Sequence, residues 1–118
     1  MKYNSIEPFI PSGSNFQASR QLFLELGFSI TWEKSDYIGF ENNGCRFILQ
    51  NYDVKEFAEN LMLRLRVNDL DEFWHNLSEK NLPDKFGVKL HEPTDFPWSR
   101  EVVLIDIAGV CWHFVQSD

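Results

Sequence analysis

Short runs of alternating apolar and polar residues dominate the chain and predict strands. Ser5–Pro11 is apolar at every second position, and the strand-like segments Phe28–Glu33, Tyr37–Glu41 and Cys45–Gln50 come later. Between the first strand and these three, Phe16–Leu26 carries its apolar residues near one helical face. The first half of the chain therefore predicts the order β-α-β-β-β.

Polar residues at the boundaries support these elements. Asn15 precedes the helix, where its side-chain oxygen can accept a free backbone N–H. Gly27 follows the helix, since glycine takes the left-handed conformation without steric cost. Asn43-Gly44 is a hairpin sequence, so it predicts a tight turn between two strands.

The same order restarts after a polar stretch, 51–60, in which Val54–Ala58 predicts one helical turn. Leu61–Val67 alternates as a half-buried strand, and Asp69 or Asn68 can cap a helix from Leu70 to about Lys80. Three further strands are predicted, with Ala108-Gly109 as the turn between the last two: Lys85–Glu92, Arg100–Asp106 and Cys111–Gln116.

The repeated order predicts an α+β fold in a single domain, residues 1–118. Two tandem β-α-β-β-β modules, about 5–50 and 61–116 with 51–60 as linker, would form curved sheets around a cleft with helices outside.

Composition narrows the class of protein. The 118 residues include 11 Lys+Arg and 18 Asp+Glu, a net charge of −7, and 15% of them are aromatic. Nucleic acids and membrane surfaces select cationic proteins, so neither partner is expected. The sequence has no apolar segment long enough to span a bilayer and no apolar signal core, which predicts a cytoplasmic location. Cys45 and Cys111 fall in apolar strands and are expected as buried thiols.

Several strings resemble one known family. Pro97–Glu101 reads PWSRE, Asp106–Gly109 reads DIAG and Cys111–Val115 reads CWHFV. The chain is similar in these strings and in its element order to the vicinal oxygen chelate superfamily, which includes glyoxalases, extradiol dioxygenases and bleomycin resistance proteins. The bleomycin resistance proteins are most similar, with PWGRE, DPAG and CxHFV at the corresponding places.

This resemblance implies a homodimer that sequesters a bulky cationic glycopeptide in grooves at the subunit interface, without cofactor, metal or chemistry. Carried over position by position, the groove aromatics fall on Trp32, Tyr37, Phe47 and Trp98. Pro8 matches a proline near an N-terminal arm that is exchanged between subunits, so strand exchange is expected.

Arg64 and Arg66 depart from the family, because they share a strand face with Met62 where bleomycin binders carry large aromatics. Two interpretations stand. Both arginines could pair with nearby carboxylates such as Glu7. Alternatively, they recognise an anionic or planar ligand, since a guanidinium binds carboxylates bidentately and stacks on rings.

The metal-dependent enzymes of the superfamily take one ligand from each of four strands. The corresponding places are Glu7, Ile48 or Leu49, Met62 and His113, of which only Glu7 and His113 can bind a metal well. Only two of the four ligand places carry a side chain suited to a metal, so no functional metal site is expected. A metal-dependent lyase or dioxygenase remains the alternative, and a scaffold whose own side chains fill the cleft is a third reading.

The sequence thus predicts a non-catalytic protein that binds a small molecule, planar aromatic or glycopeptide. Stacking from Trp32, Tyr37 and Trp98 would provide affinity, and Arg64 and Arg66 would select the ligand. Four carboxylates could form a rim that attracts a cation, or could simply be solvated: Glu33, Asp36, Asp95 and Glu101.

Overall fold

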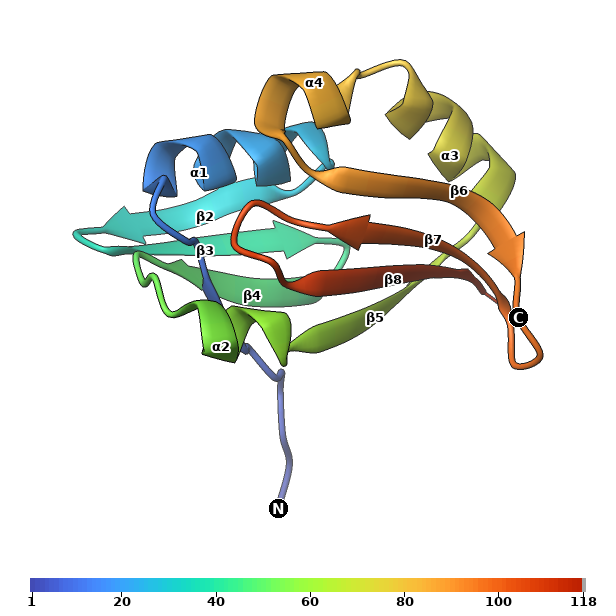
Figure 1. The fold of residues 1–118 in the computed structure, drawn as a ribbon. Coiled ribbons are helices and arrows are strands. Elements are labelled where there is room, and N and C mark those ends of the chain that lie inside the picture. Colours follow the sequence, from blue (N-terminus) through green and yellow to red (C-terminus); the bar gives the residue numbers. More distant parts are fainter. Residues whose placement is uncertain (118) are drawn as a thin grey trace.

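Two four-stranded sheets with helices packed on them make up the computed structural model, which describes residues 1–117 (Figure 1). The first module contains β1 (Phe9–Pro11), α1 (Phe16–Glu25), β2 (Ser29–Lys34), β3 (Tyr37–Asn42) and β4 (Cys45–Gln50). The short helix α2 (Lys55–Glu59) leads to the second module, which contains β5 (Met62–Val67), α3 (Leu70–Ser78), α4 (Leu82–Phe86), β6 (Lys89–Asp95), β7 (Arg100–Ile105) and β8 (Cys111–Gln116).

The two sheets have the same topology. Their strand orders are β1-β4-β3-β2 and β5-β8-β7-β6. In each, the first strand pairs in parallel with the last, and the other neighbours are antiparallel. The predicted α+β class with two tandem modules is therefore confirmed.

The predicted caps and turns are present. The Asn15 side chain accepts the Ala18 backbone N–H at 3.0 Å, and the Asp69 side chain accepts that of Glu72 at 3.1 Å. Asn43 and Gly44 both have positive φ, of 49° and 85°, as the tight turn between β3 and β4 requires.

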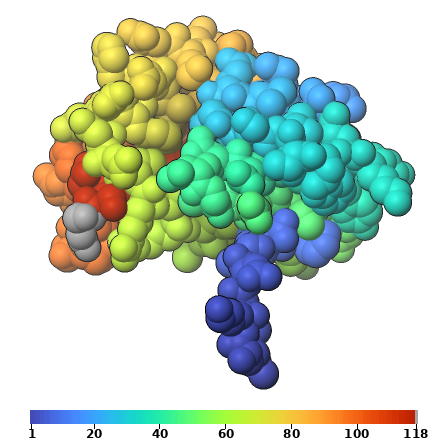
Figure 2. Space-filling model, turned by 180° about the vertical axis from the view of Figure 1, so that it is seen from behind, coloured from blue at the N-terminus to red at the C-terminus, as the bar shows by residue number. Residues whose placement is uncertain are grey.

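The N-terminal strand is much shorter than predicted. β1 begins at Phe9, and only the Pro8 carbonyl before it joins the sheet, by accepting the Ile48 N–H at 2.9 Å. Residues 1–7 are exposed and leave the body of the molecule as an extended segment (Figures 1 and 2). Alternation predicted a strand here, but a strand also needs a neighbouring strand, and residues 1–7 have none among residues 1–117.

The prediction of a strand beginning at Lys85 is wrong, because Lys85 lies in helix α4. Pro83 suits the first turn of this helix, where a missing N–H costs nothing. Gly87 ends it with φ of +71°, and the strand β6 follows from Lys89.

The core joins the modules through aromatic rings. The Phe23 ring of α1 lies 4.9 Å from the Phe47 ring of β4 and 5.3 Å from the Trp112 ring of β8, centroid to centroid. All three side chains are at most 3% exposed. One continuous buried cluster thus fixes both sheets against α1. Within residues 1–117, no helix has the length and apolar character needed to cross a membrane.

Truncation at the centre of this cluster tests its role. Phe23→Ala removes a ring that contacts both modules and should lower the free energy of unfolding by about 3–5 kcal/mol. Phe57→Ala, whose ring is 47% exposed, is the control and should cost far less. Urea denaturation measures both; equal losses would contradict a shared core around Phe23.

Candidate functional site

Three aromatic rings lie on the outer face of the first sheet, opposite its buried face. Phe9, Ile48, Gly39 and Trp32 are successive partners across β1, β4, β3 and β2. Tyr37 lies two residues from Gly39 on the same face, with its ring 6.1 Å from that of Phe9. We call Phe9, Trp32 and Tyr37 the ring face.

A glycine and a bulge place Trp32 on this face. The pairing of β2 with β3 shifts register between Ile30 and Trp32, so Trp32 points outward although Ile30 packs on the core. A Cβ at Gly39 would lie 2.2 Å from the Trp32 Nε1, which means that the indole lies directly over the glycine. The indole is thus held against the sheet while 41% of Trp32 remains exposed.

A groove of about 570 Å³ lies between the two sheets, beside the N-terminal segment. Phe28 and Phe47 form its wall on one side, and Met62, Arg64 and Arg66 of β5 line the other. Phe47 is only 3% exposed, so its ring is a wall of the core as well as of the groove. We call this the arginine groove.

The two arginines are exposed because β5 is half-buried, as predicted. Leu63 and Leu65 turn inward, while Arg64 and Arg66 turn outward with Met62. Among residues 1–117, neither guanidinium lies within 4.0 Å of a carboxylate. The expected pairing with Glu7 is not formed.

The second sheet carries a buried carboxylate, Glu101, that organises its neighbours. The Trp98 Nε1 and the Ser99 hydroxyl donate to its Oε2 at 3.0 and 2.6 Å, and the His113 Nδ1 lies 2.8 Å from its Oε1. Burial raises the pKa of Glu101, but the hydrogen bonds from Ser99, His113 and Trp98 outweigh it and the pKa is lowered overall. We call these four residues the Glu101 cluster.

The cluster selects one tautomer of the neutral His113 ring and extends to a thiol. A carboxylate only accepts, so the His113 Nδ1 carries a proton and Nε2, 3.3 Å from the Cys111 Sγ, accepts in the neutral ring. Burial, with the charges of Glu101 and Asp106, raises the pKa of the Cys111 thiol. Cys111 is partly exposed and Cys45 is exposed, so the prediction of two buried thiols is wrong.

The predicted site residues fall into three places. Trp32 and Tyr37 are on the ring face, whereas Phe47, Arg64 and Arg66 line the arginine groove. Trp98 lies on the loop between β6 and β7, is 70% exposed, and stacks on Phe96 with ring centroids 5.1 Å apart. A single chain therefore does not bring all predicted rings into one pocket.

The structure changes the role of the predicted acidic rim. Glu101 is 3% exposed and belongs to the buried cluster, so it is not a rim residue. Glu33 is bound to Arg20, and Asp95 contacts Arg100. Asp36 accepts a hydrogen bond from the Asn51 side chain.

Sequence reasoning missed two rings that lie beside the predicted ones. Phe9 lies beside Tyr37, and Phe96 lies beside Trp98. Phe9 could have been found, because alternation with Ile10 turns its ring outward.

The residues predicted for a metal site do not fit a metal. Glu7 is exposed on the N-terminal segment, where its carboxylate contacts Ser5. Both ring nitrogens of His113 already have partners within the second sheet. Within the described part of the chain, no three His, Cys, Asp or Glu side chains are grouped to hold an ion.

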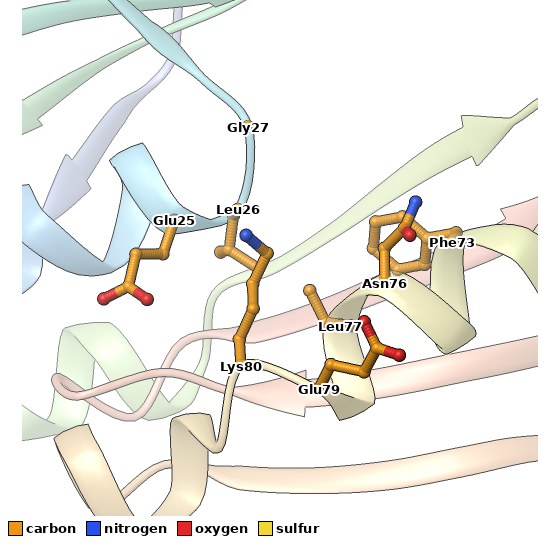
Figure 3. A pocket seen from close by; sticks show the side chains of 8 residues that line it. All are labelled: Glu25, Leu26, Gly27, Phe73, Asn76, Leu77, Glu79 and Lys80. Atoms are coloured by element: carbon orange, nitrogen blue, oxygen red, sulfur yellow. The ribbon is translucent and has the colours of Figure 1, made fainter.

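A second hollow, of about 390 Å³, lies on the helical side of the molecule between the ends of α1 and α3. Figure 3 shows Lys80 reaching from the end of α3 toward Leu26, with Glu25 and Glu79 nearby. Glu25 is already paired with Lys85, and none of the predicted site residues lines this hollow. The arginine groove is larger and has aromatic walls, and is the better candidate.

The fold is that of known antibiotic-binding proteins. A bleomycin-binding protein solved with bleomycin superposes with a TM-score of 0.83 and 18% identity over 98% of this chain and 100% of the other. A bleomycin-binding protein of Streptomyces verticillus, solved with copper(II)-bleomycin, gives 0.82 and 20% over 100% and 99%. A glyoxalase/bleomycin resistance protein/dioxygenase of Nocardioides gives 0.65 and 16% over 98% and 85%.

No protein-family model matches the sequence, and comparison with curated proteins returns no match. The resemblance predicted from the strings around Trp98 and His113 is confirmed at the level of the fold.

Acid should remove the contribution of the Glu101 cluster. Because folding lowers the pKa of Glu101 below its usual value of 4.5, the ionised side chain stabilises the fold above that pH, and the stabilisation is lost as pH falls through the folded pKa. Glu101→Gln should therefore be less stable than the wild type at pH 7, with the gap narrowing below pH 4.5.

Urea denaturation at several pH values measures this difference. Glu56→Gln changes an exposed carboxylate and is the matched control. A gap between wild type and Glu101→Gln that stays constant down to pH 3, on the order of 1.5 units below the usual glutamate pKa, would falsify the assignment.

Proposed function

We propose that this protein binds and sequesters a bleomycin-type antibiotic or a similar planar molecule, without transforming it. The observation that carries the proposal is the ring face: Trp32 and Tyr37 stay exposed while Gly39 and the bulge hold the indole in place. Exposed rings held rigidly are suited to stacking on flat heteroaromatic ligands, because little conformational entropy is lost on binding. The fold shared with proteins that bind bleomycin supports the same conclusion.

The second part of the proposal is that the active form is a homodimer with ligand grooves between subunits. One chain leaves large apolar side chains uncovered, among them Phe9 at 52%, Met62 at 67% and Trp98 at 70% exposure. Contact with a second subunit would bury these side chains. A second subunit facing the ring face with its own Trp98 and His113 would gather the dispersed rings into one groove.

The N-terminal segment is the candidate link between subunits. Tyr3 and Ile6 of this segment are 88% and 86% exposed. An exchanged segment would bury these side chains against the other subunit. Exchange of the segment is part of the proposal and is consistent with the Pro8 position expected from the resemblance.

A protein that sequesters its ligand must bind it tightly, and it needs no group that reacts with the ligand. The polar side chains of the Glu101 cluster are engaged with one another, since Glu101 is hydrogen-bonded to both Trp98 and His113. A metal-dependent lyase or dioxygenase is the alternative predicted from the sequence, and no feature of Glu7 or His113 favours it.

Binding to bleomycin tests the function directly. Isothermal titration should give a saturable complex, and Trp32→Ala and Trp98→Ala should each weaken it about tenfold, roughly 1.4 kcal/mol of lost stacking. Tyr52→Ala is the control, because Tyr52 is 41% exposed, as Trp32 is, but its ring packs on Phe57 of α2. Binding that survives both tryptophan substitutions contradicts the proposed role of the rings.

Light scattering coupled to size-exclusion chromatography tests the assembly. The wild type should elute at twice the chain mass of 13.9 kDa. Deletion of residues 1–7 should shift the equilibrium toward monomer, because the exchanged contacts are lost, while far-UV circular dichroism stays unchanged. A wild type that remains monomeric at 100 µM, about a hundredfold above a Kd of ~1 µM, excludes a stable homodimer.

A further inference from the structure

The arginine groove runs between two strand edges that lack partners within residues 1–117. β5 ends its sheet, so its outer edge is free. On the opposite wall, β1 covers β4 only at Ile48–Gln50, so at Cys45–Phe47 the β4 edge that faces away from β3 has no strand partner. The groove therefore has backbone donors and acceptors along its length, in addition to its side chains.

The charges of the groove are opposite to the charge of the chain. The protein carries −7 overall, and three of its five arginines, Arg20, Arg46 and Arg100, contact a carboxylate. Arg64 and Arg66 are the two that do not, within the described residues, although carboxylates outnumber cations. Two unpaired guanidiniums on adjacent outward positions of one strand, ~6.8 Å apart along it, create a local positive field.

Apolar side chains make up much of the groove lining, in which Asn4, Ser5 and Arg46 are further polar members. Phe28, Phe47 and Trp112 contribute rings that are at most 6% exposed, and Met62 adds an exposed flexible thioether. A volume of about 570 Å³ lies within the usual range for a drug-sized ligand, roughly 300–1,000 Å³.

We propose that the arginine groove selects small amphipathic anions, in which an aromatic or aliphatic body lies against Phe47 and Met62 and an acidic group is bound by Arg64 and Arg66. A guanidinium binds a carboxylate, phosphonate or sulfonate through two parallel hydrogen bonds, so the pair can engage one such group from either side. The inference rests on the proposed small-molecule binding, and it assigns the arginine groove, which is separate from the ring face, an anionic ligand class of its own. A purely cationic ligand is disfavoured here, because it would meet two uncompensated positive charges.

Three compounds with one ring system test the charge preference: 2-naphthoate, 2-naphthamide and 2-naphthylmethylammonium. Titration calorimetry or protein NMR shifts should show naphthoate binding at least tenfold more tightly than the ammonium compound, with the amide between them. Naphthoate affinity should fall with added salt, because the guanidinium–carboxylate attraction is screened.

The variants Arg64→Gln and Arg66→Gln test whether these two arginines cause the preference for anions. Each should weaken naphthoate binding about tenfold and leave naphthamide binding within twofold. Lys55→Gln removes the same charge from an exposed position on α2 and should change neither. Thermal melting confirms that the variants are folded.

The outcomes separate this inference from the proposed function. Equal affinity for the three compounds, or arginine variants that bind naphthoate as the wild type does, overturns the anion preference even if bleomycin binds. Loss of the dimer in Arg64→Gln or Arg66→Gln also overturns it, because the arginines then serve the subunit contact. Naphthoate selectivity that depends on both arginines supports the inference, even if bleomycin fails to bind.

Discussion

The contact of one ring, Phe23, with Phe47 and Trp112 joins the two sheets and determines which of their faces stay open. Each partner belongs to a different sheet, and α1 supplies the ring between them. One face of each sheet packs on this shared core, so only the opposite face of each sheet can contact other molecules. The ring face and the Glu101 cluster are parts of those remaining faces, and the arginine groove is the seam between the sheets beside the core.

The buried polar groups of the second sheet are hydrogen-bonded to one another. Glu101 is buried, and its carboxylate is satisfied by Trp98, Ser99 and His113, which ties the loop after β6 to the strand β8. The exposed Trp98 ring is thus anchored at its indole nitrogen while its face remains open. On the first sheet the exposed Trp32 ring is held in a different way, by close contact of the indole with Gly39.

Sequence patterns predicted the local elements well where the information is local. The caps at Asn15 and Asp69 and the turn at Asn43-Gly44 depend on adjacent residues, and all are present. The length of β1 and the helix at Lys85 were mispredicted, because a strand depends on partners elsewhere in the chain. The outward turn of Arg64 and Arg66 followed from alternation, whereas their lack of carboxylate partners is a three-dimensional property that no spacing encodes.

The bulge between Ile30 and Trp32 couples two features that lie on opposite faces of the first sheet. In a regular β2 strand the residues at 30 and 32 share a face, and an indole at 32 would lie inside with Ile30. The extra residue at this point turns Trp32 to the outer face and Glu33 to the helical side, where it meets Arg20. A change that removed the bulge would therefore displace the exposed indole and the Glu33–Arg20 ion pair together.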